Sequence, residues 1–356
     1  MLFEPLSLRG LTCRNRVWLP PMCTYQAEAQ DGRATDWHLV HYGARAAGGF
    51  GLMIVEATAV DPVGRITSHD LGLWDDSQIE GFARLAGFAH RFGAALAVQL
   101  GHSGRKGSVW PDRAGFPDGL QPLEQGGWQP VGPGPEAFPQ LASPWALSTA
   151  EVQALPAVFA AAAARAQAAG LDAVELHAAH GYLLHQFLSP LSNHRDDQYG
   201  GDLAGRARLL RETVAAVRRV WPESKPLFVR LSATEWVDDG WSLDDTLALV
   251  EDLKPLGVDL VDVSSGGNLV TAIPSGPGYQ VGLAAAVKQA SGLAVAAVGQ
   301  ITEPVQADQI VRLGQADAVL VGRAGLREPA WPERAAAALG RPTPLADSYR
   351  RGAFPR

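Results

Sequence analysis

Two histidines and a tyrosine, His177, His180 and Tyr182, stand close together directly after a short apolar run. Two imidazoles that converge on one point can donate hydrogen bonds to a carbonyl oxygen, and so stabilise the enolate that forms when hydride adds to a conjugated double bond. A neighbouring tyrosine hydroxyl can then deliver the proton. The spacing predicts this chemistry, with two alternatives: histidines that serve the core only, or a zinc site completed by Glu56, Glu175 or His102.

A second group of residues near the end of the chain has the character of a phosphate site. Gly299 and Gly322 each follow a short apolar run, and Arg323 comes next. Glycine lets backbone amides approach an anion closely, and a guanidinium can bind a phosphate through two parallel hydrogen bonds. The alternative is that the glycines form tight turns and that Arg323 makes a surface ion pair.

Three further side chains at the ends of apolar runs suit an electron-poor ring that becomes anionic on reduction. Gln99 offers amide hydrogen bonds and Arg230 offers positive charge, while Cys23 places a thiol nearby. Gln99 and Arg230 could instead close an internal polar network, and Cys23 could be a buried, inert thiol.

These residues need a scaffold that gathers the ends of many strands. Short apolar runs alternate with helical stretches along the whole chain, which predicts repeated βα units around a parallel sheet. The expected strands are Val17–Leu19, Leu52–Ala57, Ala94–Leu100, Ala173–His177, Leu227–Leu231, Leu260–Val263, Ala294–Val298 and Ala318–Val321. We therefore expect a (β/α)8 barrel, whose active site lies at the carboxyl ends of its strands.

The helical stretches include Thr149–Ala169 and Asp244–Leu256, the second with Ser242 and Asp244 as candidate N-caps. A doubly wound open sheet is the alternative fold, but no Gly-x-Gly-x-x-Gly turn follows the first strand. One domain is expected over residues 1–356. The connection 101–147, rich in Gly, Pro and Trp, is expected to form a lid or substrate loop inside it.

Composition narrows the class of protein. The 356 residues are 47% hydrophobic and 19% charged, with a net charge of −7 and no basic run, which argues against binding to nucleic acid or to an anionic membrane. The N-terminal residues do not resemble a secretory signal, and no apolar run is long enough to span a bilayer. The two cysteines are too few for a disulfide framework or an iron–sulfur cluster, so a cytoplasmic location is expected.

The sequence also carries a family resemblance over almost its whole length. The segments LFEPLSLRGLTCRNRVWLPPMCTY, AVQLGHSGRK and ELHAAHGYLLHQFLSPLSNHRDDQYGG, together with VGR near the C-terminus, resemble the Old Yellow Enzyme family of FMN-dependent ene-reductases. The cysteine of MCTY is similar to that of the thermophilic-like branch, where other branches carry threonine. The resemblance implies bound FMN, NADPH or NADH as reductant, and activated alkenes as substrates.

Residue by residue, the resemblance implies that Cys23 lies against the flavin and that Ala57, Gln99 and Arg230 contact its ring. His177 and His180 would bind the substrate carbonyl, Tyr182 would donate the proton, and Tyr25 would line the substrate pocket. The phosphate would bind at Gly299, Gly322 and Arg323. We also assign to the cofactor site four other residues that follow the first and sixth strands: Pro21, Met22, Ser265 and Gly266.

The C-terminal tail, 341–356, is similar to the tail that reaches into a neighbouring subunit in that branch. Arg351 is the matching arginine, so a homodimer or a dimer-based tetramer is expected. The sequence departs from the family pattern at Ala353, where an aromatic residue is usual, and Phe354 comes one position later.

Other functions remain open at this stage. A metal-dependent hydrolase on the same barrel would carry zinc, and a flavin-binding module without turnover would bind FMN but show no reaction. A Schiff-base aldolase is disfavoured because none of the lysines lies in the core of an expected strand: Lys106, Lys225, Lys254 and Lys288.

Overall fold

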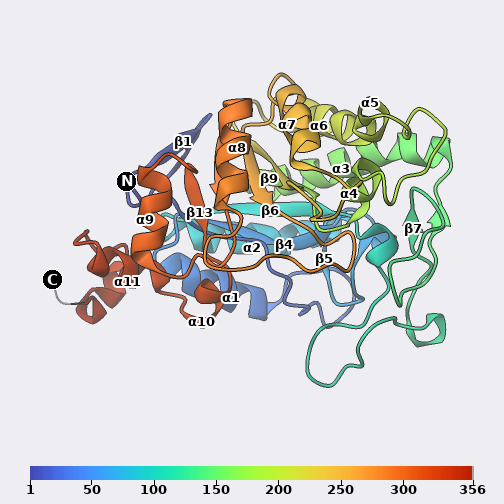
Figure 1. Ribbon diagram of the computed structural model, residues 1–356. Helices are drawn as coiled ribbons and strands as arrows, with labels where there is room; N and C mark the ends of the chain where they lie inside the picture. The colour runs from blue at the N-terminus through green and yellow to red at the C-terminus, as the bar shows by residue number, and fades with distance from the viewer. Residues whose placement is uncertain (355–356) are drawn as a thin grey trace.

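The computed structural model describes residues 1–354, in which eight parallel strands form a closed barrel. The strands follow one another around the barrel in chain order. The first of them pairs with both the second and the last, which closes the sheet. Helices surround this sheet in Figure 1. The predicted (β/α)8 barrel is confirmed, and the alternative of an open doubly wound sheet is wrong.

Each barrel strand falls where an apolar run predicted one, with ends that differ by at most two residues. The strands are β3 (Val17–Leu19), β4 (Leu52–Ala59), β6 (Ala95–Gly101), β9 (Ala173–Ala178), β10 (Leu227–Ser232), β11 (Leu260–Ser264), β12 (Ala294–Ala297) and β13 (Ala318–Leu320). A short strand, β5 (Leu71–Gly72), pairs with the end of β4.

The helices of the βα units alternate with these strands. They are α1 (Asp36–Ala47), α2 (Ile79–His90), α3 (Thr149–Ala168), α6 (Arg208–Val220), α7 (Leu243–Leu253), α8 (Val281–Ser291) and α9 (Pro304–Arg312). Four shorter or terminal helices complete the set: α4 (Leu183–Leu188), α5 (Leu203–Arg206), α10 (Arg323–Arg327) and α11 (Trp331–Ala338).

Side-chain caps begin two of the longer helices. Ser148 accepts a hydrogen bond from the amide of Glu151 at the start of α3, and Ser242 accepts one from the amide of Asp245 at the start of α7. In both cases the carboxylate of the acid accepts a hydrogen bond from the backbone amide of the serine, which is the capping-box arrangement. Ser242 is thus confirmed as a cap. Asp244 does not serve as one, and α7 ends at Leu253, three residues earlier than expected.

Side chains on each barrel strand alternate between the outer layer of helices and the barrel interior. The interior cluster includes Trp18 and Phe228, whose rings stack with centroids 6.0 Å apart. Polar side chains follow two residues after apolar members of this cluster on five strands, so they face the barrel interior nearer its carboxyl end. They are Glu56, Gln99, Glu175, Arg230 and Asp262. The barrel interior is therefore apolar toward the amino ends of the strands and polar toward their carboxyl ends.

A hairpin that the sequence analysis did not predict closes the amino end of the barrel. Strands β1 (Leu6–Leu8) and β2 (Leu11–Cys13) pair antiparallel. Leu8 and Cys13 pack into the interior cluster. Their side chains seal the end of the barrel that lies opposite the carboxyl ends of the strands.

The connection 101–147 is more ordered than a plain loop. It contains two 3-10 turns, η3 (Gly104–Lys106) and η4 (Leu123–Gln125), and a pair of short strands, β7 (Val131–Gly132) and β8 (Trp145–Ala146). In Figure 1 it extends from the side of the barrel away from the two termini. Trp128 anchors it, because the indole Nε1 donates to the carbonyl of Val63 at 3.0 Å and the guanidinium of Arg65 lies 4.8 Å from the indole centre.

The predicted tail, 341–356, is described as far as residue 354 and includes a 3-10 segment, η5 (Asp347–Gly352); residues 355–356 lie outside the described part of the chain. Among residues 1–354, no helix combines the length and the apolarity that a membrane span requires.

Candidate active site

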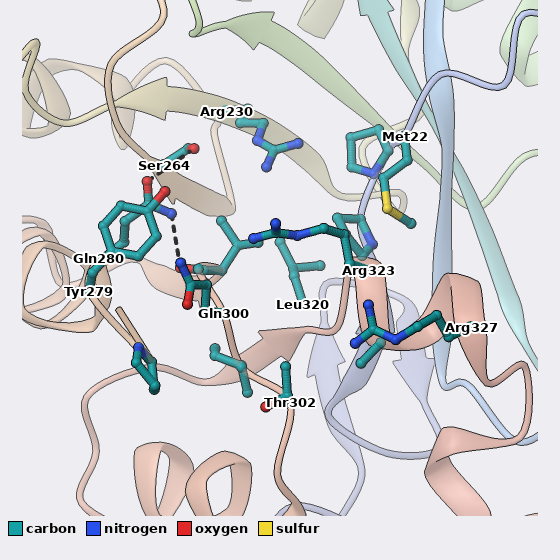
Figure 2. Close-up of a pocket in the computed structure, with 18 residues that line it drawn as sticks. Met22, Arg230, Ser264, Tyr279, Gln280, Gln300, Thr302, Leu320, Arg323 and Arg327 are labelled. Atoms are coloured by element: carbon teal, nitrogen blue, oxygen red, sulfur yellow. Dashed lines mark hydrogen bonds between the residues drawn. The ribbon is translucent and has the colours of Figure 1, made fainter. Parts of the chain in front are cut away.

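A cavity of about 460 Å³ opens at the carboxyl end of the barrel. Its lining comes from the ends of β3, β10, β11, β12 and β13 and from the segments that follow them. Figure 2 shows the guanidinium groups of Arg230 and Arg323 directed into this cavity, with Arg327 beside them. Six of the predicted cofactor residues share the lining: Pro21, Met22, Arg230, Gly299, Gly322 and Arg323.

One end of the cavity is suited to an anion. Arg323 and Arg327 line it, and within residues 1–354 neither has a carboxylate within 4.0 Å of its guanidinium. Gly299 has φ +124°, a backbone angle that a side chain would disfavour, so the turn after β12 depends on glycine. The sequence analysis missed Arg327, although its position four residues after Arg323 on one helix places both on the same face.

The predicted histidines and tyrosine meet outside the lining of this cavity, where His180 contacts the lining residue Ser264. The ring centroids of His177 and His180 lie 5.2 Å apart, and those of His177 and Tyr182 lie 4.9 Å apart. Burial is the main reason that the pKa of each histidine is well below its ordinary value, and the charge of Arg230 lowers both further. Both imidazoles are therefore neutral near pH 7.

Hydrogen bonds indicate which nitrogen of His177 carries the proton. Its Nδ1 accepts from the amide of Ala179 at 3.3 Å, so in the neutral ring the hydrogen is on Nε2. His177 therefore offers an N–H from Nε2 to a ligand.

His180 is held by a small relay of hydroxyl and amide groups. Its Nε2 lies 2.7 Å from the hydroxyl of Ser264. That hydroxyl is 3.4 Å from Oε1 of Gln280, which already accepts from Ser265 at 2.6 Å. The single hydrogen of the Ser264 hydroxyl can point to only one of these two acceptors, and where it points to His180, the imidazole carries its own hydrogen on Nδ1.

The backbone of His180 is also unusual. Its φ is +59°, which is rare for a residue with a side chain and costs conformational energy. Its amide donates to Ser232 at 2.9 Å, and its carbonyl accepts from the ammonium of Lys106 at 2.9 Å. These contacts hold the strained turn in place.

Lys106 was not assigned a role from the sequence. It is half-buried, its ammonium also donates to the carbonyl of Gly267 at 2.8 Å, and it lies 5.1 Å from the ring centre of Tyr182. Burial lowers the pKa of Lys106 to about 8. It lies in η3 of the 101–147 connection, where neither helical nor strand periodicity could have indicated that it turns inward.

Cys23 and Tyr25 follow β3 at the same mouth. Burial raises the pKa of the Cys23 thiol well above its ordinary value, and the carboxylates of Asp70 and Glu56 raise it further. Cys23 lines a hollow of about 480 Å³ beside α1 instead of the 460 Å³ cavity, whereas Ala57, His177 and Tyr182 share a much smaller space. Tyr25 has φ +55°, and its carbonyl accepts a hydrogen bond from Arg113 of the 101–147 connection.

Glu56 fixes the segment that carries Cys23 and Tyr25. Its carboxylate accepts hydrogen bonds from the amide of Thr24 at 2.8 Å and from the hydroxyls of Thr24 and Tyr42. The side chain is buried, and this burial raises the pKa of Glu56 to about 7. Sequence analysis considered Glu56 only as a possible metal ligand.

Several predicted residues lie apart from the cavity. Ser265 bonds to Gln280, and Gly266 bonds to the backbone of Thr234, while the adjacent Ser264 lines the cavity. Arg351 is exposed in η5 and does not line the cavity of its own chain. No group of three or more His, Cys, Asp or Glu side chains is arranged to hold a metal anywhere in residues 1–354.

Comparison with known proteins now decides the family. A model of the NADH:flavin oxidoreductase / NADH oxidase family matches residues 1–341. The chain belongs to this family. The predicted membership of the Old Yellow Enzyme group is confirmed, and the chain is an FMN-dependent NAD(P)H oxidoreductase.

Curated relatives of this oxidoreductase match it from end to end. NADPH dehydrogenases of Geobacillus thermodenitrificans (strain NG80-2) and Bacillus subtilis (strain 168) are 44% and 42% identical to it over 352 residues. Each alignment covers 99% of the chain and 98% of the relative.

Solved structures agree with the fold of the flavin oxidoreductase. Morphinone reductase is 28% identical, with a TM-score of 0.79, over 96% of this chain and 90% of that one. An Old Yellow Enzyme homologue from Zymomonas mobilis is 25% identical, with a TM-score of 0.79, over 96% and 93%.

The residues of the oxidoreductase fit FMN. Arg323 and Arg327 line the cavity, have no carboxylate partner within residues 1–354 and suit a phosphate, while Arg230, which is paired with Asp262, lines the cavity as well. Gln99 faces the barrel interior on β6, and its amide nitrogen bonds to Glu175, so the amide oxygen remains available as an acceptor. A ring that gains negative charge on reduction would find both a cation and an amide there.

Proposed function

We propose that this oxidoreductase reduces the carbon–carbon double bond of α,β-unsaturated carbonyl compounds. The observation that carries the proposal is the pair of neutral imidazoles, His177 and His180, with Tyr182 beside them. Two neutral donors favour the carbonyl oxygen of a substrate most strongly when that oxygen gains negative charge. An addition of hydride to a conjugated double bond produces that charge.

When bound, FMN supplies the hydride, which it has received from NADPH or NADH. We assign the phosphate to Gly299, Gly322 and Arg323, with Arg327 added. The ring would lie against Pro21, Met22, Cys23 and Ala57, with Gln99 and Arg230 at its polar edge.

Two N–H groups would hold the substrate oxygen: the one at Nε2 of His177 and the one at Nδ1 of His180. The relay through Ser264 supports the second assignment, because a hydroxyl that donates to Nε2 leaves Nδ1 protonated. Neutral rings also avoid a fixed positive charge that would bind anions in place of a neutral ketone.

Tyr182 would donate the proton to the α carbon of the substrate. Burial raises the pKa of its hydroxyl well above the ordinary value, so the hydroxyl keeps its proton throughout the physiological pH range. Its place beside His177 brings the proton to the same end of the substrate as the carbonyl. Tyr25 would line the pocket on the side of the β3 segment.

The 101–147 connection would cover the substrate side of the site, since its Arg113 bonds to the carbonyl of Tyr25 and its Lys106 bonds to that of His180. Arg351 of a second copy would approach the same mouth in a homodimer or dimer-based tetramer. The exposure of Arg351 supports this role, because its own chain does not enclose it.

The test is a visible absorption spectrum of the purified protein, followed without oxygen by NADPH and then by 2-cyclohexenone. We expect a flavin spectrum that bleaches with NADPH and returns with the enone. A yellow protein that NADPH bleaches but the enone does not restore would refute alkene reduction. A colourless protein with bound zinc would refute the flavin site and return the histidines to a metal-binding role.

A further inference from the structure

Two buried acids behind the proposed ring site take no part in the chemistry described above. Glu175 on β9 and Asp262 on β11 are both completely buried, on the inward face of the barrel. Arg230 lies on β10, the strand between them, in register with Asp262. Gln99 on β6 is in register with Glu175. Each acid therefore stands next to one of the two residues assigned to the ring.

The first contact orients Gln99. Its Nε2 donates to Oε1 of Glu175 at 2.8 Å, and Gln99 is buried. An amide whose nitrogen is held in this way presents its oxygen elsewhere, as an acceptor. The imide edge of an isoalloxazine ring carries an N–H group, which needs such an acceptor.

The second contact moderates Arg230. Its Nε lies 3.1 Å from Oδ2 of Asp262, but the two groups are not aligned as a hydrogen bond. Neither oxygen of Asp262 has a hydrogen-bond partner within residues 1–354, so the charge of Arg230 is its main compensation. The terminal nitrogens of the guanidinium are left to face the cavity, where Figure 2 shows them.

A structural role alone explains this arrangement poorly. A buried acid without hydrogen bonds costs stability, and an apolar residue in its place would cost less. Burial, together with the charge of Asp262, raises the pKa of Glu175, and burial raises the pKa of Asp262. Glu175 and Asp262 therefore lie in a low-dielectric environment, where they interact strongly with a change of charge on a neighbouring group.

We propose that Glu175 and Asp262 are positioning residues for bound FMN: Glu175 fixes the amide of Gln99 and so strengthens binding of the oxidised ring, and Asp262 orients and partly neutralises Arg230 and so sets the reduction potential. Neither acid touches the reactants. The inference rests on the proposed placement of the flavin ring at Gln99 and Arg230.

Asp262→Asn is the principal variant, and the readout is the midpoint potential of bound FMN, measured by equilibration with a redox dye. Removal of the acid leaves the charge of Arg230 uncompensated, which favours the reduced, anionic ring. We expect reduced FMN to gain about tenfold in affinity relative to oxidised FMN. For a two-electron couple, this ratio corresponds to a rise of about 30 mV.

The matched control is Asp259→Asn, because Asp259 immediately precedes the same strand and also pairs with arginine. It lies at the amino end of the barrel, where its carboxylate contacts Arg9 at 2.6 Å. We expect this variant to keep the wild-type potential. Equal potentials for Asp262→Asn and Asp259→Asn would overturn the role of Asp262.

Glu175 is tested through the affinity of the apoprotein for oxidised FMN. Glu175→Leu removes the acceptor that holds Gln99, so we expect affinity to fall about tenfold, while Glu175→Gln can still bond to the amide and should restore most of it. Equal affinities for the Leu and wild-type proteins would overturn the role of Glu175. Should Asp262→Asn not fold, Asp262→Ala gives the same test of charge.

The two hypotheses fail in different ways. If wild-type apoprotein does not bind FMN, the proposed site is wrong. If the wild type binds FMN and reacts with NADPH and enone, but the potential and affinity of the variants match the wild type, only the inference about the two acids is wrong.

Discussion

The proposed phosphate end and the proposed carbonyl end of the site would recognise their targets by opposite means. At the phosphate end, Arg323 and Arg327 are exposed, charged and unpaired within the described residues, and they lie on one short helix. At the carbonyl end, His177 and His180 are neutral, and buried groups fix their orientation. A permanent anion is bound by charge, which tolerates imprecise geometry, whereas a transient negative charge needs neutral donors that are already in place.

The largest effect should come from breaking the carbonyl end. In His177→Ala, one of the two N–H donors is lost, and such a donor contributes about 3–4 kcal/mol, or roughly 10²–10³-fold in rate. We expect reoxidation of the reduced protein by 2-cyclohexenone to slow by this factor in stopped-flow measurements, while FMN remains bound.

His194→Ala is the control for that variant, since His194 is an exposed histidine outside the site. It should react like the wild type. Reduction by NADPH is followed in parallel, because the nicotinamide could use the same histidine. An unchanged rate of reoxidation in His177→Ala would remove the basis for the carbonyl end.

The phosphate end should respond in affinity instead of rate. Arg323→Ala removes a charged hydrogen-bonding group worth about 1.5–3 kcal/mol, so the dissociation constant for FMN should rise roughly 10- to 100-fold. Titration of the apoprotein by flavin fluorescence measures it. Arg219→Ala, which changes an exposed arginine of α6, should not alter it. If Arg323→Ala reacted more slowly with enone even at saturating FMN, the phosphate end would also affect the chemistry at the carbonyl end.

The third test concerns Glu56, the buried acid that fixes the segment with Cys23 and Tyr25, and asks whether its protonation stabilises the fold. The pKa of Glu56 is raised from 4.5 to about 7 in the folded protein. Its contribution to stability is therefore complete below pH 4.5 and is lost as the pH rises through 7. Urea unfolding should show that this decline, on the order of 3 kcal/mol, is absent from Glu56→Gln. The exposed Glu80→Gln should keep the decline.

The smallest expected effect is the response of the histidines to pH. Because the pKa values of His177 and His180 are well below 6.5, neither ring should change its charge between pH 6 and 8. The rate of reoxidation by enone should show no histidine inflection in that range. An inflection that disappears in His177→Ala would show that the ring titrates and that the contrast between the two ends is weaker than described.

Sequence patterns predicted the barrel well because each strand is buried on both faces and reads as a continuous apolar run. The same runs predicted which residues come together, because the residues that follow parallel barrel strands all lie at the carboxyl end of the barrel. The sequence did not predict the hairpin β1–β2, because its strands have only three residues each and are too short to show the alternating hydrophobic pattern of a strand. Lys106 was missed for a different reason: its burial depends on an irregular turn, whose path follows from tertiary contacts alone.

The hairpin that seals the amino end of the barrel has a kinetic consequence. Leu8 and Cys13 fill that end, so among the described residues the carboxyl end is the face from which the barrel interior can be reached. Under the proposed function, nicotinamide and alkene would both approach the ring site from that face. They would then compete for it, and an excess of either one would slow the reaction of the other.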